Sequence, residues 1–297
     1  MHTNQNRGRL TLFSPRPRPS TAKSVPVLIY TVFLRTLLIR PGGIGDCILS
    51  FPAMEAMVAG ETEVWISGQA VSLVRFASRA RSLSSTGIDL LGLHDVEPPP
   101  QIIDSLSRFD SIISWYGANR PEFREAVASL GLPFRFLDAL PPGHNTMHAA
   151  DFYFRQAGRA GPAVPRIACQ SHGGDYAVIH PFSGSPRKNW PLPRFRELAD
   201  RLDMPVRWCA GPEEKLENAV RFDDLYGLAE WLANARLYIG NDSGITHLAA
   251  AVGTPVVAIF GPTDPAIWGP RGERVQVISK HGAWPEIDEV AARAIML

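Results

Sequence analysis

The stretch GNDSGITHLAAAVGTPVVAIFGPTD, residues 240–264, decides the fold class of this 297-residue chain. It follows a short apolar run, Leu237–Ile239, that is typical of a strand. Apolar residues then recur at helical spacing from Ile245 to Val252, and a second β-branched run covers Pro255–Phe260. Strand, helix and strand in this order predict a right-handed β-α-β crossover in a parallel sheet.

The polar turn between this strand and this helix is suited to bind phosphate. Asp242 or Ser243 is expected to cap the helix, and Gly244 allows a ligand to approach the backbone. The N–H groups of the first turn and the positive end of the helix dipole then face the carboxyl edge of the sheet, where α/β proteins bind nucleotides. The same sequence pattern also fits an ordinary capped helix in a parallel sheet that binds no ligand.

A second glycine turn lies in LLIRPGGIGDCILSFPAM, residues 37–54, between the apolar strand Leu37–Ile39 and a helix. It is not a Walker loop, because no Gly-Lys-Ser/Thr follows. Nor is it the dinucleotide fingerprint, because Ile48 stands where the third glycine belongs. Asp46, at the junction of turn and helix, can cap the helix or act as a general base.

A third segment, YAVIHPFSGSPRKNWPLPRFRELADRL, residues 176–202, opens from the strand Tyr176–Ile179 into a polar loop before an amphipathic helix. Hydroxyls beside cations suit phosphate oxygens, with Lys188 as a point charge and Trp190 packing the loop. Alternatively, the adjacent basic residues form only a solvated surface pair. The loop residues concerned are Ser183, Ser185, Arg187, Lys188 and Trp190.

In this order, the three segments resemble the heptosyltransferases, glycosyltransferase family 9, whose members carry G-x-G-D, K-x-W-P and G-N-D-[ST]-G-x-x-H-L-A-A motifs. Here they read GIGD, KNWP and GNDSGITHLAA, and the resemblance spans residues 35–271. It implies an α/β fold of the GT-B type, in which two Rossmann-like domains with parallel sheets face each other across a cleft.

The expected organisation has three parts. Residues 1–34 form a basic leader without acidic residues, which we expect to be disordered. Residues 35–165 form the N-terminal, acceptor-binding domain, and residues 166–297 form the C-terminal domain that binds the nucleotide-sugar donor. The Pro- and Gly-rich stretch 141–165 is the expected hinge region. The resemblance favours a native start at Leu34, and a secretory signal is not supported, because no small-residue cleavage site follows the apolar run.

Composition narrows the partners and the compartment. A net charge of +1 gives no global attraction to nucleic acid, so none is expected as a partner. Three cysteines without a C-x-x-C pair indicate neither a disulfide framework nor zinc, and they fit free thiols in the cytoplasm. The run Val25–Leu34 is too short to span a bilayer, so any contact with the inner membrane is expected to be peripheral. Arg75, Phe76, Arg79 and Arg81 either meet anionic sugars or lipid, or form an exposed helix face.

The resemblance implies inverting transfer of a heptose from ADP-heptose to a sugar hydroxyl of the lipopolysaccharide inner core. Asp46 matches the family's candidate base, and Gly43 and Gly45 belong to its acceptor-side loop. Glu214 matches an acidic position near the donor's ribose, although Glu213 could serve instead and a solvated acidic turn fits as well.

The remaining predicted residues serve the donor. Asp242 matches the family's donor-side aspartate, which orients sugar hydroxyls as well as capping its helix. Stabilisation of the negative charge on the leaving diphosphate is assigned to Lys188, Ser183, Ser185 and the N–H groups of Ser243 and Gly244. His247 either packs beneath the turn or contacts the ligand. The chain lacks an Asp-x-Asp motif, so neither a metal nor another cofactor is expected.

Two other functions compete with this one. The same chemistry can act on a different nucleotide sugar or acceptor, because pocket-lining loops choose the sugar and the fold does not. The second is a non-catalytic nucleotide-sugar-binding protein. Segments 219–231 and 279–297 look trimmed for the family, which puts donor closure in doubt.

Overall fold

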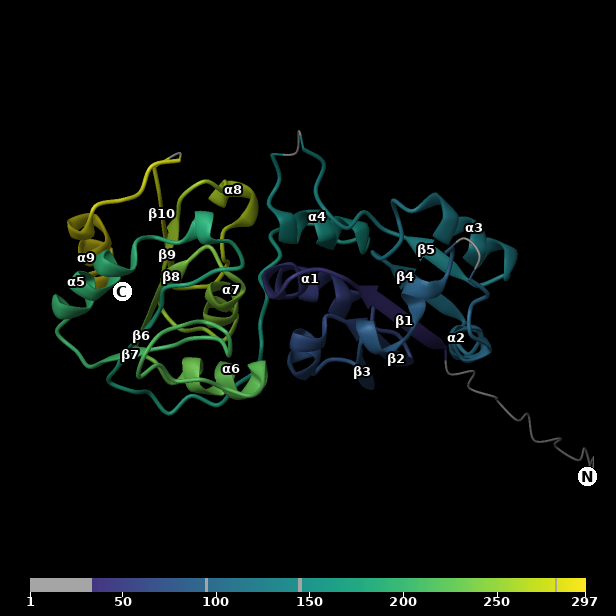
Figure 1. The fold of residues 1–297 in the computed structure, drawn as a ribbon, viewed down its shortest axis with the longest axis horizontal. Helices are drawn as coiled ribbons and strands as arrows, with labels where there is room; N and C mark the ends of the chain where they lie inside the picture. Colours follow the sequence, from purple (N-terminus) through teal and green to yellow (C-terminus); the bar gives the residue numbers. More distant parts are fainter. Residues whose placement is uncertain (1–33, 94–95, 144–145, 281) are drawn as a thin grey trace, which may run out of the picture. The chain divides into compact units, whose positions relative to one another are not determined.

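The computed structural model describes residues 34–93, 96–143, 146–280 and 282–297, so the expected leader lies outside the described residues except for Leu34. The first half contains a five-stranded parallel sheet in the order β3-β2-β1-β4-β5 (Figure 1). Its strands are β1 (Arg35–Arg40), β2 (Glu61–Ile66), β3 (Arg79–Ser82), β4 (Ser111–Ser114) and β5 (Phe134–Phe136).

The second half contains another five-stranded parallel sheet, in the order β10-β9-β8-β6-β7. Its strands are β6 (Ala177–His180), β7 (Val206–Trp208), β8 (Leu237–Asn241), β9 (Val256–Phe260) and β10 (Val275–Ser279). The parallel sheets and the β8-helix-β9 crossover predicted from the sequence are confirmed. The first order is that of dinucleotide-binding folds, whereas the second is the flavodoxin-like order.

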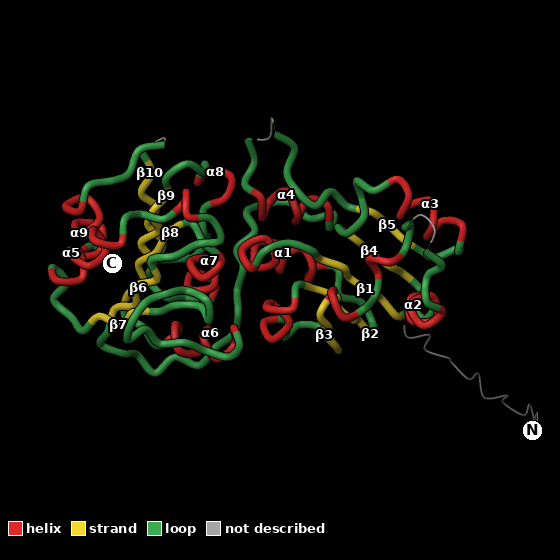
Figure 2. Tube along the Cα trace, in the orientation of Figure 1, coloured by secondary structure: helices red, strands yellow, loops and turns green. Residues whose placement is uncertain are grey.

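Helices cover both faces of each sheet (Figure 2). In the first half, α1 covers one face and α2 and α3 the other; in the second, α6 and α7 cover one face and α5 and α9 the other. The helices are α1 (Ile44–Ala56), α2 (Pro100–Leu106), α3 (Pro121–Ser129), α4 (Ala149–Gln156), α5 (Leu192–Asp200), α6 (Leu225–Ala233), α7 (Gly244–Ala251), α8 (Pro265–Trp268) and α9 (Ile287–Ile295). Short 3-10 helices are η1 (Gly68–Leu73), η2 (Leu83–Ser85), η3 (Ile88–Leu90) and η4 (Pro186–Lys188).

Alternation along the strands divides the core into layers. Leu37 and Ile39 of β1 pack toward α2 and α3, while Leu38 between them belongs to the cluster that contains α1. That cluster continues through α4, α6 and α7 to β8 and β9. One apolar core therefore joins the inner helices of both sheets.

The expected hinge region, residues 141–165, contains the helix α4. Asp151 of α4 forms a bidentate ion pair with Arg271, with N–O distances of 2.5 and 2.7 Å. His148, the N-cap of α4, is hydrogen-bonded through Nε2 to the Gly269 carbonyl at 2.8 Å. These contacts tie α4 to the loop after α8. The predicted domain boundary at residue 165 stays a prediction.

The segment with Arg75, Phe76, Arg79 and Arg81 was predicted either to meet anionic sugars or lipid or to form an exposed helix face. The segment with Arg75 is no helix face, because η1 ends at Leu73 and β3 begins at Arg79, so that alternative is wrong. Phe76 packs edge-on against Phe51 in the core, and the Arg75 guanidinium lies 4.7 Å from the centre of the Tyr226 ring.

The three cysteines are free, as predicted: Cys47 and Cys209 are buried and Cys169 is half-buried.

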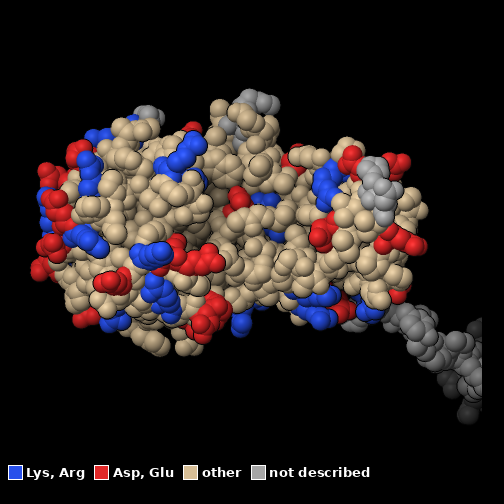
Figure 3. Space-filling view, viewed as in Figure 1, with Lys and Arg blue, Asp and Glu red and all other residues tan. Residues whose placement is uncertain are grey.

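The surface has no single dominant sign on the face shown in Figure 3, where acidic and basic side chains are interspersed. This distribution agrees with the net charge of +1. None of the helices that the structure describes is long and apolar enough to cross a membrane.

Candidate active site

One pocket of about 610 Å³ is lined by residues from both halves of the chain. It is lined by the residues that were predicted as base, as acceptor-side loop and as donor-binding residues. These are Gly43, Gly45 and Asp46 from the first half, and Ser183, Ser185, Lys188, Glu214, Asp242, Ser243, Gly244 and His247 from the second.

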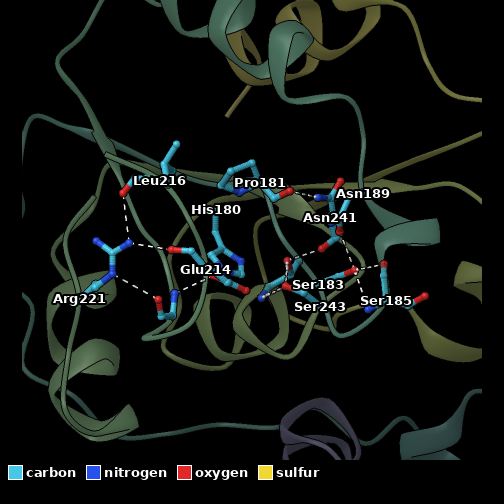
Figure 4. Close-up of polar contacts among 12 residues, drawn as sticks. His180, Pro181, Ser183, Ser185, Asn189, Glu214, Leu216, Arg221, Asn241 and Ser243 are labelled. Carbon is cyan, nitrogen blue, oxygen red and sulfur yellow. Dashed lines mark hydrogen bonds and ion pairs between the residues drawn. The ribbon is translucent and has the colours of Figure 1, made fainter. Parts of the chain in front are cut away.

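The second-half wall lies where the strand order reverses, between β6 and β8, which is the usual ligand position in open α/β sheets. Asn241, fully buried at the end of β8, ties the two loops there together. Its side chain donates to the Pro181 carbonyl at 2.8 Å and accepts from the Trp190 N–H at 2.9 Å (Figure 4). The lysine loop and the glycine turn are therefore one hydrogen-bonded unit.

Ser243, not Asp242, caps α7. The Ser243 Oγ accepts from the Thr246 N–H at 3.3 Å, which decides between the two predicted caps. Asp242 was also expected to cap this helix, and that part of its predicted role is wrong. Its carboxylate instead accepts from Lys188 Nζ at 2.7 Å and from the Thr263 hydroxyl at 2.6 Å. These partners lie in other loops, which the local sequence does not reveal.

Lys188 ends the short helix η4 and pairs with Asp242 inside the pocket, so it is not a solvated surface cation. Its neighbour Arg187 is exposed and does not line the pocket. The Ser183 hydroxyl lies 2.7 Å from both the Ser185 carbonyl and Asn189 Oδ1. It is therefore engaged within its own loop, whose shape it stabilises. Trp190 is buried and donates its indole N–H to the Pro285 carbonyl at 3.1 Å, as expected for a residue that packs the loop.

Glu214 lies in the loop after β7 and faces the pocket, whereas Glu213 is exposed and does not line it. One carboxylate oxygen, Oε2, accepts from the Gly211 N–H at 2.6 Å and pairs with His180 Nε2 at 3.0 Å (Figure 4). Burial alone would raise the pKa of the Glu214 carboxyl, but the hydrogen bonds from His180 and Gly211 and the charge of Arg221 lower it below its usual value. Glu214 is thus held as a carboxylate.

On the first-half wall, Asp46 lies in the first turn of α1. Its Oδ2 accepts from the N–H of Gly43, the N-cap residue, at 3.1 Å, so the predicted capping role is confirmed. The buried Arg40 supports this turn from below by donating to the Asp46 carbonyl at 3.2 Å and the Ala139 carbonyl at 3.1 Å. Its guanidinium lies 4.5 Å from the centre of the Tyr153 ring. Asp46 is therefore presented by a rigid turn.

The N-termini of α1 and α7 meet beside the pocket. A Cβ added to Gly244 would lie 2.6 Å from Ile44 Cβ and 3.1 Å from the Gly45 nitrogen. A Cβ added to Gly45 would lie 3.0 Å from the His247 ring. Both glycines thus allow close helix packing, a role for Gly244 that differs from the expected approach of a ligand. The positive ends of two helix dipoles consequently face one pocket, which favours an anionic ligand.

His247 lies one turn into α7, is 6% exposed and packs beneath Gly45 while still lining the pocket. Burial lowers its pKa to about 4, with Asp242 and Asp46 opposing the shift and His148 and Lys188 adding to it. The imidazole is therefore neutral near pH 7. The ring thus packs against Gly45 of α1, a contact that neither predicted role included, and its contact with the ligand stays a prediction.

Sequence reasoning missed four residues that build the site: Arg40, His180, Asn241 and Thr263. Each of the first three is a polar residue at the end of a buried strand, and that position was the available signal. Thr263 lies in FGPTD, a part of the resemblance to which no role was assigned.

Comparison with known proteins shows what the chain is similar to. Residues 153–293 match glycosyltransferase family 9 (heptosyltransferase). The chain is 32% identical over 139 residues to lipopolysaccharide heptosyltransferase 1 of Escherichia coli O18:K1:H7 (strain RS218 / NMEC), which is 41% of each protein. It is 33% identical over 122 residues to lipopolysaccharide heptosyltransferase 1 of Pseudomonas aeruginosa, covering 36% of this chain and 34% of that protein. The chain thus aligns with about two fifths or less of these relatives' length.

Solved structures extend the likeness to the fold of both halves. The structure of E. coli heptosyltransferase WaaC with ADP matches with a TM-score of 0.63 at 18% identity, over 89% of this chain and 98% of that one. The structure of E. coli ADP-heptose lps heptosyltransferase II matches with a TM-score of 0.66 at 18% identity, over the same shares. The fold is therefore GT-B, as predicted. The C-terminal half of the chain, residues 153–293, thus matches glycosyltransferase family 9, the heptosyltransferase family, and both halves share the fold of the solved heptosyltransferases.

Proposed function

We propose that this protein is an inverting, metal-independent glycosyltransferase that moves a heptose from ADP-heptose to a sugar hydroxyl of the lipopolysaccharide inner core. The family and the names of the relatives support heptosyl transfer to lipopolysaccharide. The relative solved with ADP, and another solved with ADP-2-deoxy-2-fluoro heptose, support the donor. The pocket supports the chemistry, because it joins a carboxylate of one half with a cation and a helix N-terminus of the other.

The donor's diphosphate fits beside Lys188 and the first turn of α7. The Ser243 and Gly244 N–H groups, the Lys188 ammonium and the α7 dipole supply positive charge there. Lys188 now pairs with Asp242 at 2.7 Å, so donor binding requires the ammonium to be shared between carboxylate and phosphate. Asp242 can then accept hydroxyls of the transferred sugar, while Glu214 accepts the ribose hydroxyls of the nucleoside.

The reaction is a single displacement. Asp46 takes the proton from the acceptor hydroxyl as its oxygen attacks the anomeric carbon. The bond from that carbon to the diphosphate oxygen breaks, ADP leaves, and the anomeric configuration inverts. Lys188 and the α7 N–H groups neutralise the charge that develops on the leaving diphosphate, where stabilisation lowers the barrier.

The observation that carries the proposal is the presence of Asp46 in the same pocket as the Lys188 loop. A protein that only binds a nucleotide sugar has no need of a carboxylate on the opposite wall. The test follows ADP release from ADP-heptose with a heptose-deficient lipopolysaccharide acceptor. Asp46→Asn is the informative variant, because Asn keeps an oxygen that can accept the Gly43 N–H.

We expect the parent to release ADP and Asp46→Asn to lose about 100- to 10,000-fold in turnover, the usual contribution of a general base. Donor affinity, measured by calorimetry, should change little. A parent that binds donor but never releases ADP with any core acceptor would establish the binder function instead. Faster reaction with another nucleotide sugar would overturn the donor assignment, and loss of activity with a chelator would overturn metal independence.

We place this activity in the cytoplasm, with peripheral attachment to the inner membrane. Free thiols suit a reducing compartment, and a lipid-linked acceptor brings the enzyme to a membrane surface. Fractionation of cells should find the protein in the cytosol and in a membrane fraction from which high salt releases it. A protein found only in the periplasm would contradict this placement.

A further inference from the structure

Arg221 makes an unusual set of contacts with the loop that carries Glu214. The loop, residues 211–221, belongs to the connection between β7 and α6 and contains no helix or strand of its own. The Arg221 side chain donates to four of its backbone carbonyls, of which Figure 4 shows those of Glu214 and Leu216. The acceptors are Gly211 at 3.3 Å, Glu214 at 2.7 Å, Leu216 at 3.1 Å and Ala219 at 3.2 Å.

These contacts use most of the hydrogen-bond donors of the Arg221 side chain. A guanidinium has five N–H donors in a planar fork, and four of them are used here. Among the described residues, no carboxylate lies within ion-pair distance of Arg221, so its charge is directed at carbonyl oxygens. The side chain is exposed and does not line the pocket. Arg221 thus organises the loop from outside the pocket.

Glu214 is the residue whose position depends on this arrangement. Its carbonyl accepts from Arg221, and its N–H donates to the Gly211 carbonyl at 3.2 Å. Its Oε2 accepts from Gly211 and from His180, which occupies both lone pairs of that oxygen. Within the described part of the chain, Oε1 has no hydrogen-bond partner. It is the oxygen left free for a ligand hydroxyl.

We propose that Arg221 is a positioning residue for the nucleoside of the donor, acting through Glu214. By holding the 211–221 loop in one shape, it keeps Glu214 Oε1 at the place where the ribose hydroxyls of ADP bind. This inference rests on the proposed ADP-linked donor. It assigns the selectivity for a ribose over a deoxyribose to an exposed residue that never touches the ligand.

The experiment compares ADP with 2′,3′-dideoxy-ADP by calorimetry, using the full chain and the variant Arg221→Lys. Lysine keeps the charge but lacks the fork. Arg274→Lys is the matched control, because Arg274 is also exposed and donates to one carbonyl, that of Gly253, away from the pocket. Glu214→Ala removes the accepting oxygen itself and reports how much of the preference this carboxylate provides.

We expect the parent and Arg274→Lys to prefer ADP by about 10- to 100-fold, as for hydrogen bonds to a charged group. In Arg221→Lys and in Glu214→Ala the preference should fall to about threefold or less, because ADP binds more weakly while the dideoxy analogue is unaffected. If Arg221→Lys does not fold, Arg221→Gln, which keeps two donors, replaces it.

Three outcomes would overturn the inference. A lower melting temperature of Arg221→Lys with the full preference for ADP would make Arg221 a purely structural residue. A preference lost in Glu214→Ala but kept in Arg221→Lys would reject Arg221 and leave the ribose role of Glu214 intact. A parent that does not bind ADP would reject the proposed donor, and the inference with it.

Discussion

Lys188 and Asp242, the proposed partners of the diphosphate and of the transferred sugar, form an ion pair with each other. The Lys188 ammonium lies 2.7 Å from Asp242 Oδ2, and the Asp242 side chain is only 7% exposed. Thr263 donates to the same carboxylate oxygen. The Lys188 charge, which we propose binds the diphosphate, is therefore shared with Asp242, and donor binding must divide it between two anionic partners.

Opposite effects on ADP binding are expected when the two members of this pair are changed. Lys188→Met should weaken ADP binding by about 10-fold or more, because a charge-assisted contact is lost. Asp242→Asn should strengthen ADP binding by about threefold, since Lys188 no longer has a competing carboxylate. Turnover of ADP-heptose should fall in both. Calorimetry with ADP decides the point, and weaker binding of ADP by Asp242→Asn would show that Asp242 itself holds the nucleotide.

The neutral His247 makes stability depend on pH. Its pKa is lowered to about 4 in the folded protein, below the ordinary value of about 6.5 in an unfolded chain. As pH falls from 6.5 toward 4, the unfolded state gains a proton that the folded state does not, so folding stability decreases. Urea unfolding at pH 7 and pH 5 should show a larger loss for the parent than for His247→Gln. Equal losses would mean that His247 titrates normally.

At the scale of elements, the site depends on two helices that begin at glycine turns and touch at their N-termini. Gly244 of α7 faces Ile44 and Gly45 of α1 with no room for a Cβ. The sequence identified both turns and both helices, because strand, glycine turn and amphipathic helix follow each other within a few residues. It did not reveal that the glycines serve the contact between these helices, because their partners lie about 200 residues apart in the chain.

Gly244→Ala tests this contact. Alanine is intrinsically favoured over glycine in a helix, so any loss reports the close approach and not helix propensity. We expect a loss of about 1–3 kcal/mol in the free energy of unfolding, as for overpacked sites, together with a drop in turnover. Gly143→Ala, where an added Cβ meets nothing within 4 Å, is the control and should be neutral. A neutral Gly244→Ala would show that α1 and α7 are free to separate.

For the whole molecule, helix α4 connects the two halves. It packs in the same apolar cluster as α1, its Tyr153 hydroxyl donates to the Ala139 carbonyl at 3.1 Å, and its Asp151 pairs with Arg271. Burial alone would raise the pKa of Asp151, but the hydrogen bonds from Arg271 and Ala163 lower it below its usual value. The expected hinge region thus contains a helix bonded to the loop after α8, and its role as a hinge stays a prediction.

Breaking this connection should destabilise the protein measurably. Arg271→Met leaves Asp151 without its bidentate partner, and we expect a loss of about 1–3 kcal/mol at pH 7. The pKa of Asp151 is lowered in the folded state, so the parent's advantage should disappear as pH falls below about 4. Arg166→Met, which removes an exposed pair with Glu273, should cost less than about 0.5 kcal/mol. Equal losses in the two variants would show that the Asp151–Arg271 pair adds no special stability.

From the sequence, the residues of the site could be predicted, but most of the tertiary contacts that bring them together could not. Periodicity and glycine turns indicated the turns and helices that carry Asp46 and Ser243 and the polar loop that carries Lys188, because those signals are local. The choice between Asp242 and Ser243 as cap, the bond of Asn241 to two loops and the position of α4 depend on tertiary partners. No pattern within a short window contains that information. The second sheet's strand order was likewise set by long-range pairing.

A crystal structure of the protein with ADP-2-deoxy-2-fluoro heptose tests the central claim most directly. We predict that Lys188 Nζ and the N–H groups of Ser243 and Gly244 lie at hydrogen-bond distance from the diphosphate. The Asp46 carboxylate should then lie on the opposite side of the anomeric carbon from the leaving oxygen, with space for an acceptor hydroxyl between them. A diphosphate bound away from Lys188, or an Asp46 carboxylate on the same side as the leaving group, would contradict the account.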